Sequence, residues 1–126
     1  MPEDPCRCKG NGIFIRVQDY YRKILYDDIL WLESSGHYTT VGVRGKGTVL
    51  VCADLKRLHD HLPPSRFVRV HNRYVLNMFE VELFFGNTLR VQGRDFPIGR
   101  SFRKDALAQL NILTLRPDGN LPSLAE

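Results

Sequence analysis

Short hydrophobic segments recur through the first half of the chain, and each alternates with polar residues or ends at turn-forming residues. β-Branched and aromatic side chains dominate these segments, which favours extended backbone over helix. The segment 29–32 (Ile-Leu-Trp-Leu) is apolar on both faces, so we expect it at the buried centre of a sheet, with Trp31 in the core. The pattern predicts strands at residues 13–17, 22–26, 29–32, 38–43 and 48–52.

A short helix is predicted after the fifth of these strands. Asp54 is a typical N-cap residue, and the two prolines at 63–64 end the helical pattern. His59 and His61 fall on the polar side of this helix and are expected to be solvated. The apolar face of the helix consists of Leu55, Leu58 and Leu62.

The stretch 66–77 combines strand-forming residues with an unusual number of cations. Its valines would lie on one face of a strand, with Arg69 and His71 on the other. A break near Asn72 would present the His-Asn pair at a loop tip. Asparagine and arginine are the side chains that read adenine and guanine edges through paired hydrogen bonds. A solvated sheet face, where charges only keep an edge soluble, explains the same pattern equally well. The arginines of the stretch are Arg66, Arg69 and Arg73.

The remaining sequence continues as short strands separated by tight turns. Gly-Asn at 86–87 and Gly-Arg-Asp at 93–95 are typical turn sequences between predicted strands 81–85, 88–91 and 96–98. Phe84 and Phe85 are neighbours in one of these strands, so one ring is expected to be buried and the other exposed. Ser101 is expected to cap a second helix. The apolar face of that helix would be Phe102, Ala106, Leu107 and Leu110.

Many short strands at spacings under a dozen residues predict an all-β, sandwich-like domain with two short helices. A chain of 126 residues forms one domain by default. We expect a disordered arm at residues 1–12, the folded domain at 13–111 and a flexible tail at 112–126.

Charge changes this picture, because the cations are unevenly distributed. The whole chain carries a formal net charge of +4. The segment 64–104 holds eight basic residues against three acidic ones and is therefore +5, which leaves about −1 for the rest. A basic half favours a polyanionic partner, most often nucleic acid.

Several classes of protein are disfavoured by what the sequence lacks. No apolar run approaches the roughly 20 residues needed to span a bilayer, so no membrane insertion is expected, and no secretory signal is visible. Three cysteines cannot all pair, and the Cys-x-Cys spacing of Cys6 and Cys8 is poor for a structural zinc site. A reduced, cytoplasmic compartment is the simpler interpretation, and no cofactor or metal is expected.

Four motifs in the same order resemble the LytTR DNA-binding domain, the output module of accessory-gene-regulator type bacterial response regulators. Each motif alone is weakly specific, but their order makes a strong signal across about residues 13 to 110. The motifs are Tyr-Asp-Asp-Ile-Leu-Trp-Leu-Glu-Ser at 26–34, Leu-Lys-Arg-Leu at 55–58, the whole stretch 66–77, and Pro-Ile-Gly-Arg-Ser-Phe-Arg at 97–103.

The resemblance implies an elongated antiparallel β-sandwich of about ten short strands with two short helices. It also implies that loops, rather than a recognition helix, enter successive major grooves of double-stranded DNA in a transcriptional regulator. Three positions match the side chains that carry most base contact in the family: His37, Asn72 and Arg100. The phosphate contacts would then be Arg69, Arg73, Arg103 and Lys104.

The same resemblance implies a non-enzymatic protein that binds direct repeats in pairs, and a regulatory protein partner is possible. No heptad pattern or long apolar helix offers a dimer seam, so we expect a monomer in solution. The sequence departs from the family at Gly99, where a serine is common before the arginine, and one phosphate contact is therefore in doubt.

Two other functions remain open beside DNA recognition. His37 with the 71–72 pair faintly suggests a metal-dependent nuclease, but the nearest acids in sequence are Glu80 and Glu82, and arginines flank His71 with repulsive charge. A protein-interaction module with a basic sheet face is the third alternative.

Overall fold

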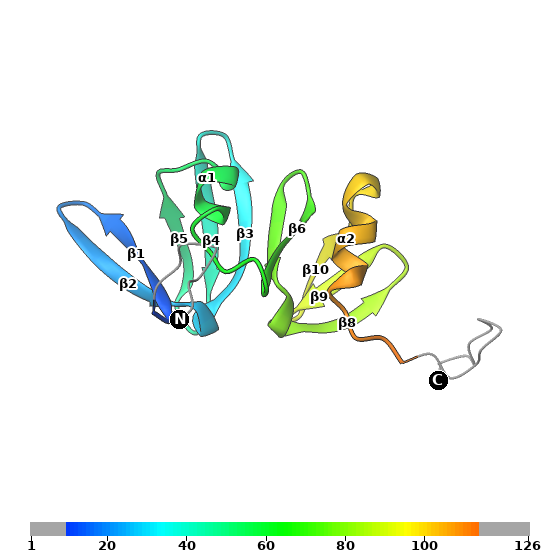
Figure 1. The fold of residues 1–126 in the computed structure, drawn as a ribbon. Helices are drawn as coiled ribbons and strands as arrows, with labels where there is room; N and C mark the ends of the chain where they lie inside the picture. The colour runs from blue at the N-terminus through cyan, green and yellow to red at the C-terminus, as the bar shows by residue number, and fades with distance from the viewer. Residues whose placement is uncertain (1–9, 114–126) are drawn as a thin grey trace.

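The computed structural model describes residues 10–113, and within them the chain is mostly β, with ten strands and two short helices (Figure 1). The predicted fold class is confirmed. The strands are β1 (Gly12–Val17), β2 (Tyr20–Leu25), β3 (Ile29–Ser35), β4 (Tyr38–Val43), β5 (Gly47–Val51), β6 (Phe67–His71), β7 (Tyr74–Asn77), β8 (Val81–Phe85), β9 (Thr88–Val91) and β10 (Arg94–Pro97). The helices are α1 (Leu55–His59) and α2 (Arg103–Ala108), with 3₁₀ turns η1 (Tyr26–Asp28), η2 (Met78–Glu80) and η3 (Arg100–Phe102).

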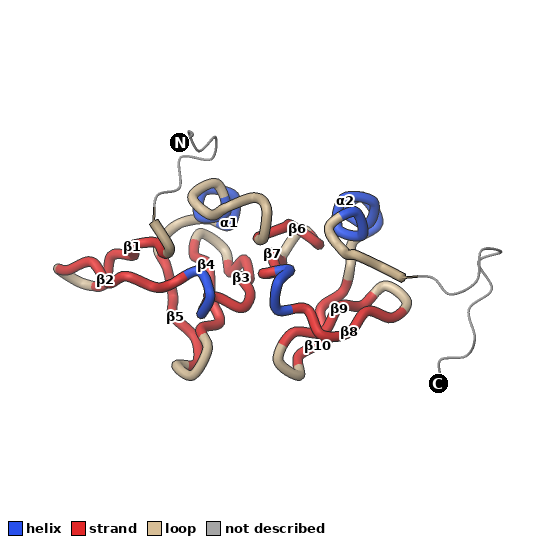
Figure 2. Tube along the Cα trace, turned by 60° about the horizontal axis from the view of Figure 1, so that its bottom comes forward, coloured by secondary structure: helices blue, strands red, loops and turns tan. Residues whose placement is uncertain are grey.

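The strands form three antiparallel sheets arranged along an elongated molecule. The central sheet has five strands in the order β5-β4-β3-β7-β6. The hairpin β1-β2 and α1 lie on one side of it, and the three-stranded sheet β10-β9-β8 and α2 lie on the other (Figures 1 and 2). None of the helices within residues 10–113 has the length and apolarity required to cross a bilayer.

The central sheet buries side chains on both faces, which divides the core into two clusters. Leu32 and Val75 belong to the first cluster, while their strand neighbours Trp31 and Leu76 belong to the second. Alternate residues of a strand point to opposite faces, so β3 and β7 each contribute to both cores. Trp31 is in the core, as predicted. The first cluster includes Ile15, Ile24, Val41, Leu55, Leu58 and Phe67, and the second includes Val70, Leu89, Val91, Phe96, Ile98 and Ala106.

A β-bulge in each of two strands adjusts this alternation. The β3–β4 register shifts between Ile29 and Trp31, and the β6–β7 register shifts between Arg69 and His71. The first bulge lets the adjacent residues Leu30 and Trp31 both pack into the second cluster.

Most predicted element positions are confirmed, with small differences at strand ends. The break in the stretch 66–77 falls at Asn72 and Arg73, between β6 and β7. Asp54 caps α1, because its carboxylate accepts the Arg57 N–H at 2.8 Å. The second strand begins and ends earlier than predicted, at Tyr20–Leu25, since the following residues turn into η1.

Two side-chain predictions are wrong. Ser101 does not cap the second helix: it lies inside η3, and Phe102 occupies the N-cap position without a side-chain bond. His59 is not simply solvated, because its Nε2 lies 2.8 Å from the Phe67 carbonyl oxygen and its ring is half-buried. The predicted arm and tail fall largely on residues 1–9 and 114–126, which lie outside the described residues, although Gly12 begins β1.

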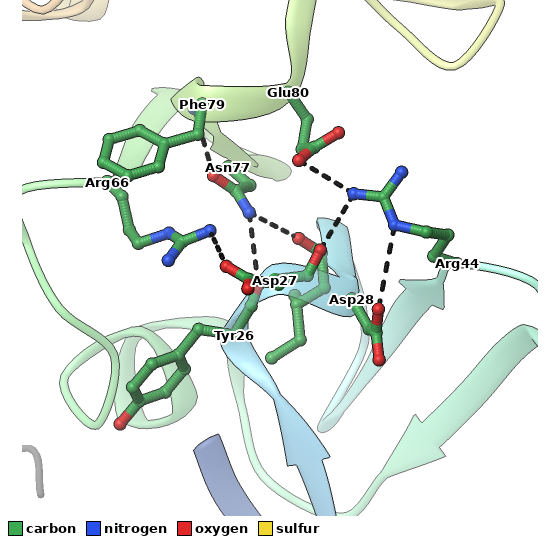
Figure 3. Close-up of polar contacts among 9 residues, drawn as sticks. Tyr26, Asp27, Asp28, Arg44, Arg66, Asn77, Phe79 and Glu80 are labelled. Carbon is green, nitrogen blue, oxygen red and sulfur yellow. Dashed lines mark hydrogen bonds and ion pairs between the residues drawn. The ribbon is translucent and has the colours of Figure 1, made fainter. Parts of the chain in front are cut away.

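One fully buried amide, that of Asn77, joins the two halves of the fold (Figure 3). Its Nδ2 donates to the main-chain oxygens of Tyr26 at 3.3 Å and Ile29 at 2.8 Å. Its Oδ1 accepts the Phe79 N–H at 3.0 Å. Asn77 therefore fixes η2, and with it the entry to the three-stranded sheet, against η1 and the start of β3.

Replacing Asn77 by alanine is expected to lower the free energy of unfolding by about 2–4 kcal/mol, because buried main-chain groups lose their partners. Asn111→Ala is the matched control: this amide is exposed, and its loss is expected to change stability by less than about 0.5 kcal/mol. Urea unfolding curves of both variants measure the difference. Equal midpoints for the two variants would contradict the structural role of Asn77.

Candidate nucleic-acid interface

Three polar side chains that the sequence singled out lie in segments gathered at one edge of the molecule. His37 is in the two-residue turn between β3 and β4, Asn72 is in the turn between β6 and β7, and Arg100 opens η3. In Figure 1 these two hairpin tips and the start of α2 all point to the upper edge. The resulting surface, built from residues 36–37, 72–73 and 99–104, is called the three-tip edge below.

Main-chain hydrogen bonds hold the three segments of this edge together. The Ser34 N–H donates to the Arg73 carbonyl at 2.8 Å, which links the β3–β4 hairpin to the β6–β7 turn. The Gly99 N–H donates to the Val70 carbonyl at 2.7 Å, which places the start of η3 beside the end of β6. Backbone bonds of this kind set the order of the tips along the edge independently of side-chain rotamers.

The side chains of His37, Asn72 and Arg100 are exposed. None of their side-chain polar atoms has a hydrogen-bond partner among residues 10–113. These donors and acceptors, unpaired within the described residues, are available to bind an external polar surface. The turn before His37 requires Gly36, whose φ is +66°, a conformation that favours glycine.

The turn that carries Asn72 is braced by Arg69 and His71. The Arg69 Nε donates to the His71 carbonyl at 3.1 Å, and its Nη2 donates to the Asn72 carbonyl at 2.6 Å. The His71 Nδ1 accepts the Arg73 N–H at 3.1 Å, and the His71 ring packs on Tyr74 with centroids 5.4 Å apart. His71 therefore has a structural role, one of the alternatives that its position in the strand allowed.

Phe102 connects this turn to η3. The Arg69 guanidinium carbon lies 5.8 Å from the centroid of the Phe102 ring. Gly99 leaves room for this packing, because a Cβ there would lie 3.1 Å from Cδ2 of Phe102 and 3.6 Å from Cα of His71. Glycine at position 99 thus leaves space for the Phe102 ring, while the distance to His71 is an ordinary van der Waals contact.

Glu33 binds two further arginines, Arg73 in the three-tip edge and Arg94 in β10. Its carboxylate lies 3.3 Å from Nη2 of Arg73 and 3.2 Å from Nη2 of Arg94. Arg94 is also stacked over the rings of Trp31, at 4.5 Å, and Phe96, at 4.7 Å. Arg73 remains 58% exposed, so its guanidinium still faces solvent.

Arg103 and Lys104 begin α2 and differ in their contacts. The Arg103 Nη1 donates to the Gly86 carbonyl at 3.1 Å and to the side-chain oxygen of Asn87, which ties α2 to the β8–β9 turn. Lys104 is exposed and makes no side-chain bond to the described residues. Arg100 and Lys104 are thus the two cations of segment 64–104 whose charged groups are uncommitted in residues 10–113.

The other arginines of segment 64–104 serve the fold. Arg66 Nη2 pairs with Asp27 at 2.9 Å, and its guanidinium carbon lies 4.3 Å from the centre of the Phe79 ring, in the cluster around Asn77 (Figure 3). Arg90 pairs with Asp95 at 2.6 Å. The excess charge of the segment is therefore partly neutralised by acids outside it, Asp27 and Glu33, whereas Asp95 is already counted in the segment's +5.

Ion pairs also explain the perturbed titratable groups. The hydrogen bond from Arg90 lowers the pKa of Asp95 and raises the pKa of Arg90 itself. The hydrogen bond to Glu80, 2.8 Å from Nη2, raises the pKa of Arg44. Arg44 also donates to the Asp27 carbonyl at 2.9 Å, so it links the β4–β5 turn region to η1 and η2 (Figure 3).

Sequence reasoning missed Glu33 and Asn87 as partners of the edge arginines. Glu33 lies opposite Tyr74 in the β3–β7 pairing, which brings it next to Arg73, 40 residues away along the chain. No local motif signals such a contact. The prediction for the Phe84–Phe85 pair is confirmed in part: Phe85 is 49% exposed, whereas Phe84 packs against the second cluster but is only partly buried.

No group of three histidine, cysteine, aspartate or glutamate residues within positions 10–113 is placed to hold a metal ion. The described residues around His37 and His71 therefore give the nuclease alternative no ligand set.

Comparison with known proteins identifies a related fold. Residues 19–111 match the family described as the LytTr DNA-binding domain. A solved structure of the LytTr DNA-binding domain of a methyl-accepting/DNA response regulator from Bacillus cereus superposes with a TM-score of 0.70 at 16% identity, covering 82% of this chain and 100% of that one. That similarity shows the fold alone. No curated protein sequence matches the chain.

Arg66→Gln is expected to lower the free energy of unfolding by about 1–3 kcal/mol, because a side chain only 15% exposed loses its pair with Asp27 and its contact with the Phe79 ring. Lys104→Gln, which removes an exposed and unpaired charge, is expected to change it by less than about 0.5 kcal/mol. Thermal and urea unfolding of the two variants test the assignment. A larger loss of unfolding free energy for Lys104→Gln than for Arg66→Gln would contradict the structural role of Arg66.

Proposed function

The chain belongs to the LytTr DNA-binding domain family, and we propose that it binds double-stranded DNA sequence-specifically, with the three-tip edge inserted in the major groove. The family establishes DNA binding in a transcriptional regulator as the general activity. The manner of binding, the residues that carry it and a bacterial regulatory setting are the proposal.

The observation that supports this proposal is the placement of three exposed polar side chains, none bonded to residues 10–113, on segments that backbone hydrogen bonds hold along one edge. His37, Asn72 and Arg100 come from separate segments but share that edge through the Ser34–Arg73 and Gly99–Val70 backbone bonds. Loop tips of this size suit the major groove, where each base pair presents a distinct pattern of donors and acceptors.

The chemistry of the three side chains suits base reading. Arg100 can donate two bonds to guanine O6 and N7, and Asn72 can both donate to and accept from adenine. A neutral His37 imidazole offers one donor and one acceptor, which gives weaker discrimination than a paired contact.

Phosphate contacts are proposed for Arg73, Arg103 and Lys104, and Arg69 is the least suited of the four predicted contacts. Lys104 is uncommitted in the described part of the chain. The exposed Arg73–Glu33 pair is of a kind that contributes only about 0–1 kcal/mol, so Arg73 can exchange Glu33 for phosphate at small cost. Arg103 keeps N–H groups beyond the Nη1 that binds the β8–β9 turn. Arg69 directs two of its donors into the turn.

We further propose that the domain is a monomer in solution and occupies direct repeats in pairs, with a separate regulatory protein as a possible partner. Each chain has one three-tip edge, so each copy of the domain would occupy one repeat of the DNA. Selection of bound duplexes from a random pool identifies the preferred site and its repeat spacing. Sedimentation showing a tight dimer without DNA would contradict the monomer.

Affinity is expected to fall steeply with salt. Three or four neutralised phosphates, at about 0.9 each, give a slope of log affinity against log salt of roughly −3 to −4. Binding isotherms on one duplex at several salt concentrations measure the slope. A slope near zero would show that the basic residues of the edge do not meet the duplex.

Substitutions are expected to separate base reading from phosphate contact. Asn72→Ala and Arg100→Ala should each cost about 1–3 kcal/mol on the preferred duplex. Asn72→Ala should barely change binding to random duplex, because an amide releases few counterions. Arg103→Ala should weaken binding to all sequences alike and make the salt slope shallower by about one.

The ratio of specific to random affinity decides between the candidate functions. If Asn72→Ala and Arg100→Ala leave this ratio unchanged, the edge is only an electrostatic surface, as in a basic protein-interaction module. Strand cleavage abolished by a chelator would instead support the nuclease alternative.

A further inference from the structure

Arg69 and Arg103 are the two arginines of segment 64–104 whose guanidinium groups bind uncharged oxygens, and Arg69 alone of the two binds only main-chain carbonyls. Arg66, Arg73, Arg90 and Arg94 each pair with a carboxylate. No carboxylate of residues 10–113 lies within ion-pair distance of Arg69, and its bonds go to the main-chain oxygens of His71 and Asn72. An arginine that takes neutral carbonyls as partners is suited to shaping the backbone that supplies them.

The two carbonyls belong to the tip that carries Asn72, so their direction matters for binding DNA. A carbonyl oxygen carries partial negative charge and, left unpaired at a loop tip, would face a polyanionic duplex. The Arg69 fork satisfies both oxygens at once, at 3.1 and 2.6 Å, and fixes the two successive peptide groups on either side of the Asn72 Cα. The side chain of Asn72 leaves the backbone between these constrained groups.

The Arg69 guanidinium also contacts η3, the segment that carries Arg100. Phe102, two residues after Arg100, has its ring centroid 5.8 Å from the Arg69 Cζ. The Gly99–Val70 backbone bond holds η3 against β6 at the same place. Arg69 thus lies between the segments that carry the two strongest candidate base readers.

We propose that Arg69 is a positioning residue for specificity: it acts through Asn72, by holding the β6–β7 turn in register with η3, rather than by contacting phosphate. The proposal rests on the proposed function and adds to it the residue that sets the geometry of base reading. A lysine cannot replace arginine in this role, because a compact ammonium lacks the planar fork that binds two acceptors in fixed directions. A lysine can replace arginine at a phosphate, where a point charge suffices.

The test compares Arg69→Lys with Arg73→Lys, two charge-conserving changes in the same hairpin. Affinity is measured for the preferred duplex from a random-pool selection and for a random duplex, in the full chain. Arg69→Lys should lower the ratio of specific to random affinity at least about fivefold, and by no more than Asn72→Ala does, which is about 5- to 150-fold. Its random-duplex affinity and salt slope should stay at wild-type values. Arg73→Lys should leave the ratio within about twofold.

A double variant shows whether Arg69 acts through Asn72. In the Asn72→Ala background, Arg69→Lys should cause no further loss of the ratio, whereas independent effects would add. Unfolding curves confirm that each variant is folded under the binding conditions, and Arg69→Gln is measured in the same way as a second variant. It should lower the ratio at least as much as Arg69→Lys.

Three outcomes separate the hypotheses. A wild-type ratio near one would overturn the proposed function and this inference with it. If the wild-type ratio of specific to random affinity is high and Arg69→Lys leaves it unchanged, the inference alone is overturned. Arg69 would then be assigned as a phosphate contact. A loss for Arg69→Lys that persists undiminished in the Asn72→Ala background would also overturn it, because Arg69 would then act by another route.

Discussion

The antiparallel pairing of β3 with β7 is the constraint on which the rest of the structure depends. It sets Trp31 opposite Leu76, Leu32 opposite Val75 and Glu33 opposite Tyr74. Because both strands are central and both of their faces are buried, a slip of one residue would exchange the two hydrophobic clusters. The same register turns the β3–β4 and β6–β7 hairpins toward one edge, so the packing of the core determines where the tips meet.

The arginines have different roles, which depend on how far each lies from that edge. Arg66 fastens the loop before β6 to η1, Arg94 covers the rings of Trp31 and Phe96, and Arg90 neutralises Asp95 on the small sheet. Close to the edge, Arg69 and Arg103 hold turns, while Arg100 and Lys104 face solvent unpaired by the described residues. Net charge alone therefore overstates the positive potential that a duplex meets. The role of each arginine depends on where the partner of its guanidinium lies.

Local signals in the sequence predict much of the fold. The strand periodicity, the break at Asn72 and the Asp54 cap each depend on a few neighbouring residues, and all three are confirmed. The role of Arg66 could not be read in this way, because Asp27 lies 39 residues away and the pair forms only once β3 and β7 are joined. The prediction for Ser101 is wrong because a 3₁₀ turn precedes the helix and moves the N-cap position to Phe102. The candidate readers followed from loop position and family resemblance, but their common edge required the strand pairing.

We propose that the three-tip edge is the surface that meets DNA. Amide chemical shifts of the isotope-labelled protein, followed while the preferred duplex is added, test this most directly. The largest changes are expected at residues 36–37, 71–73 and 99–104, with small changes on the β1–β2 hairpin and on the outer face of β8. Changes concentrated on that hairpin or on β8, with the three tips unaffected, would contradict it.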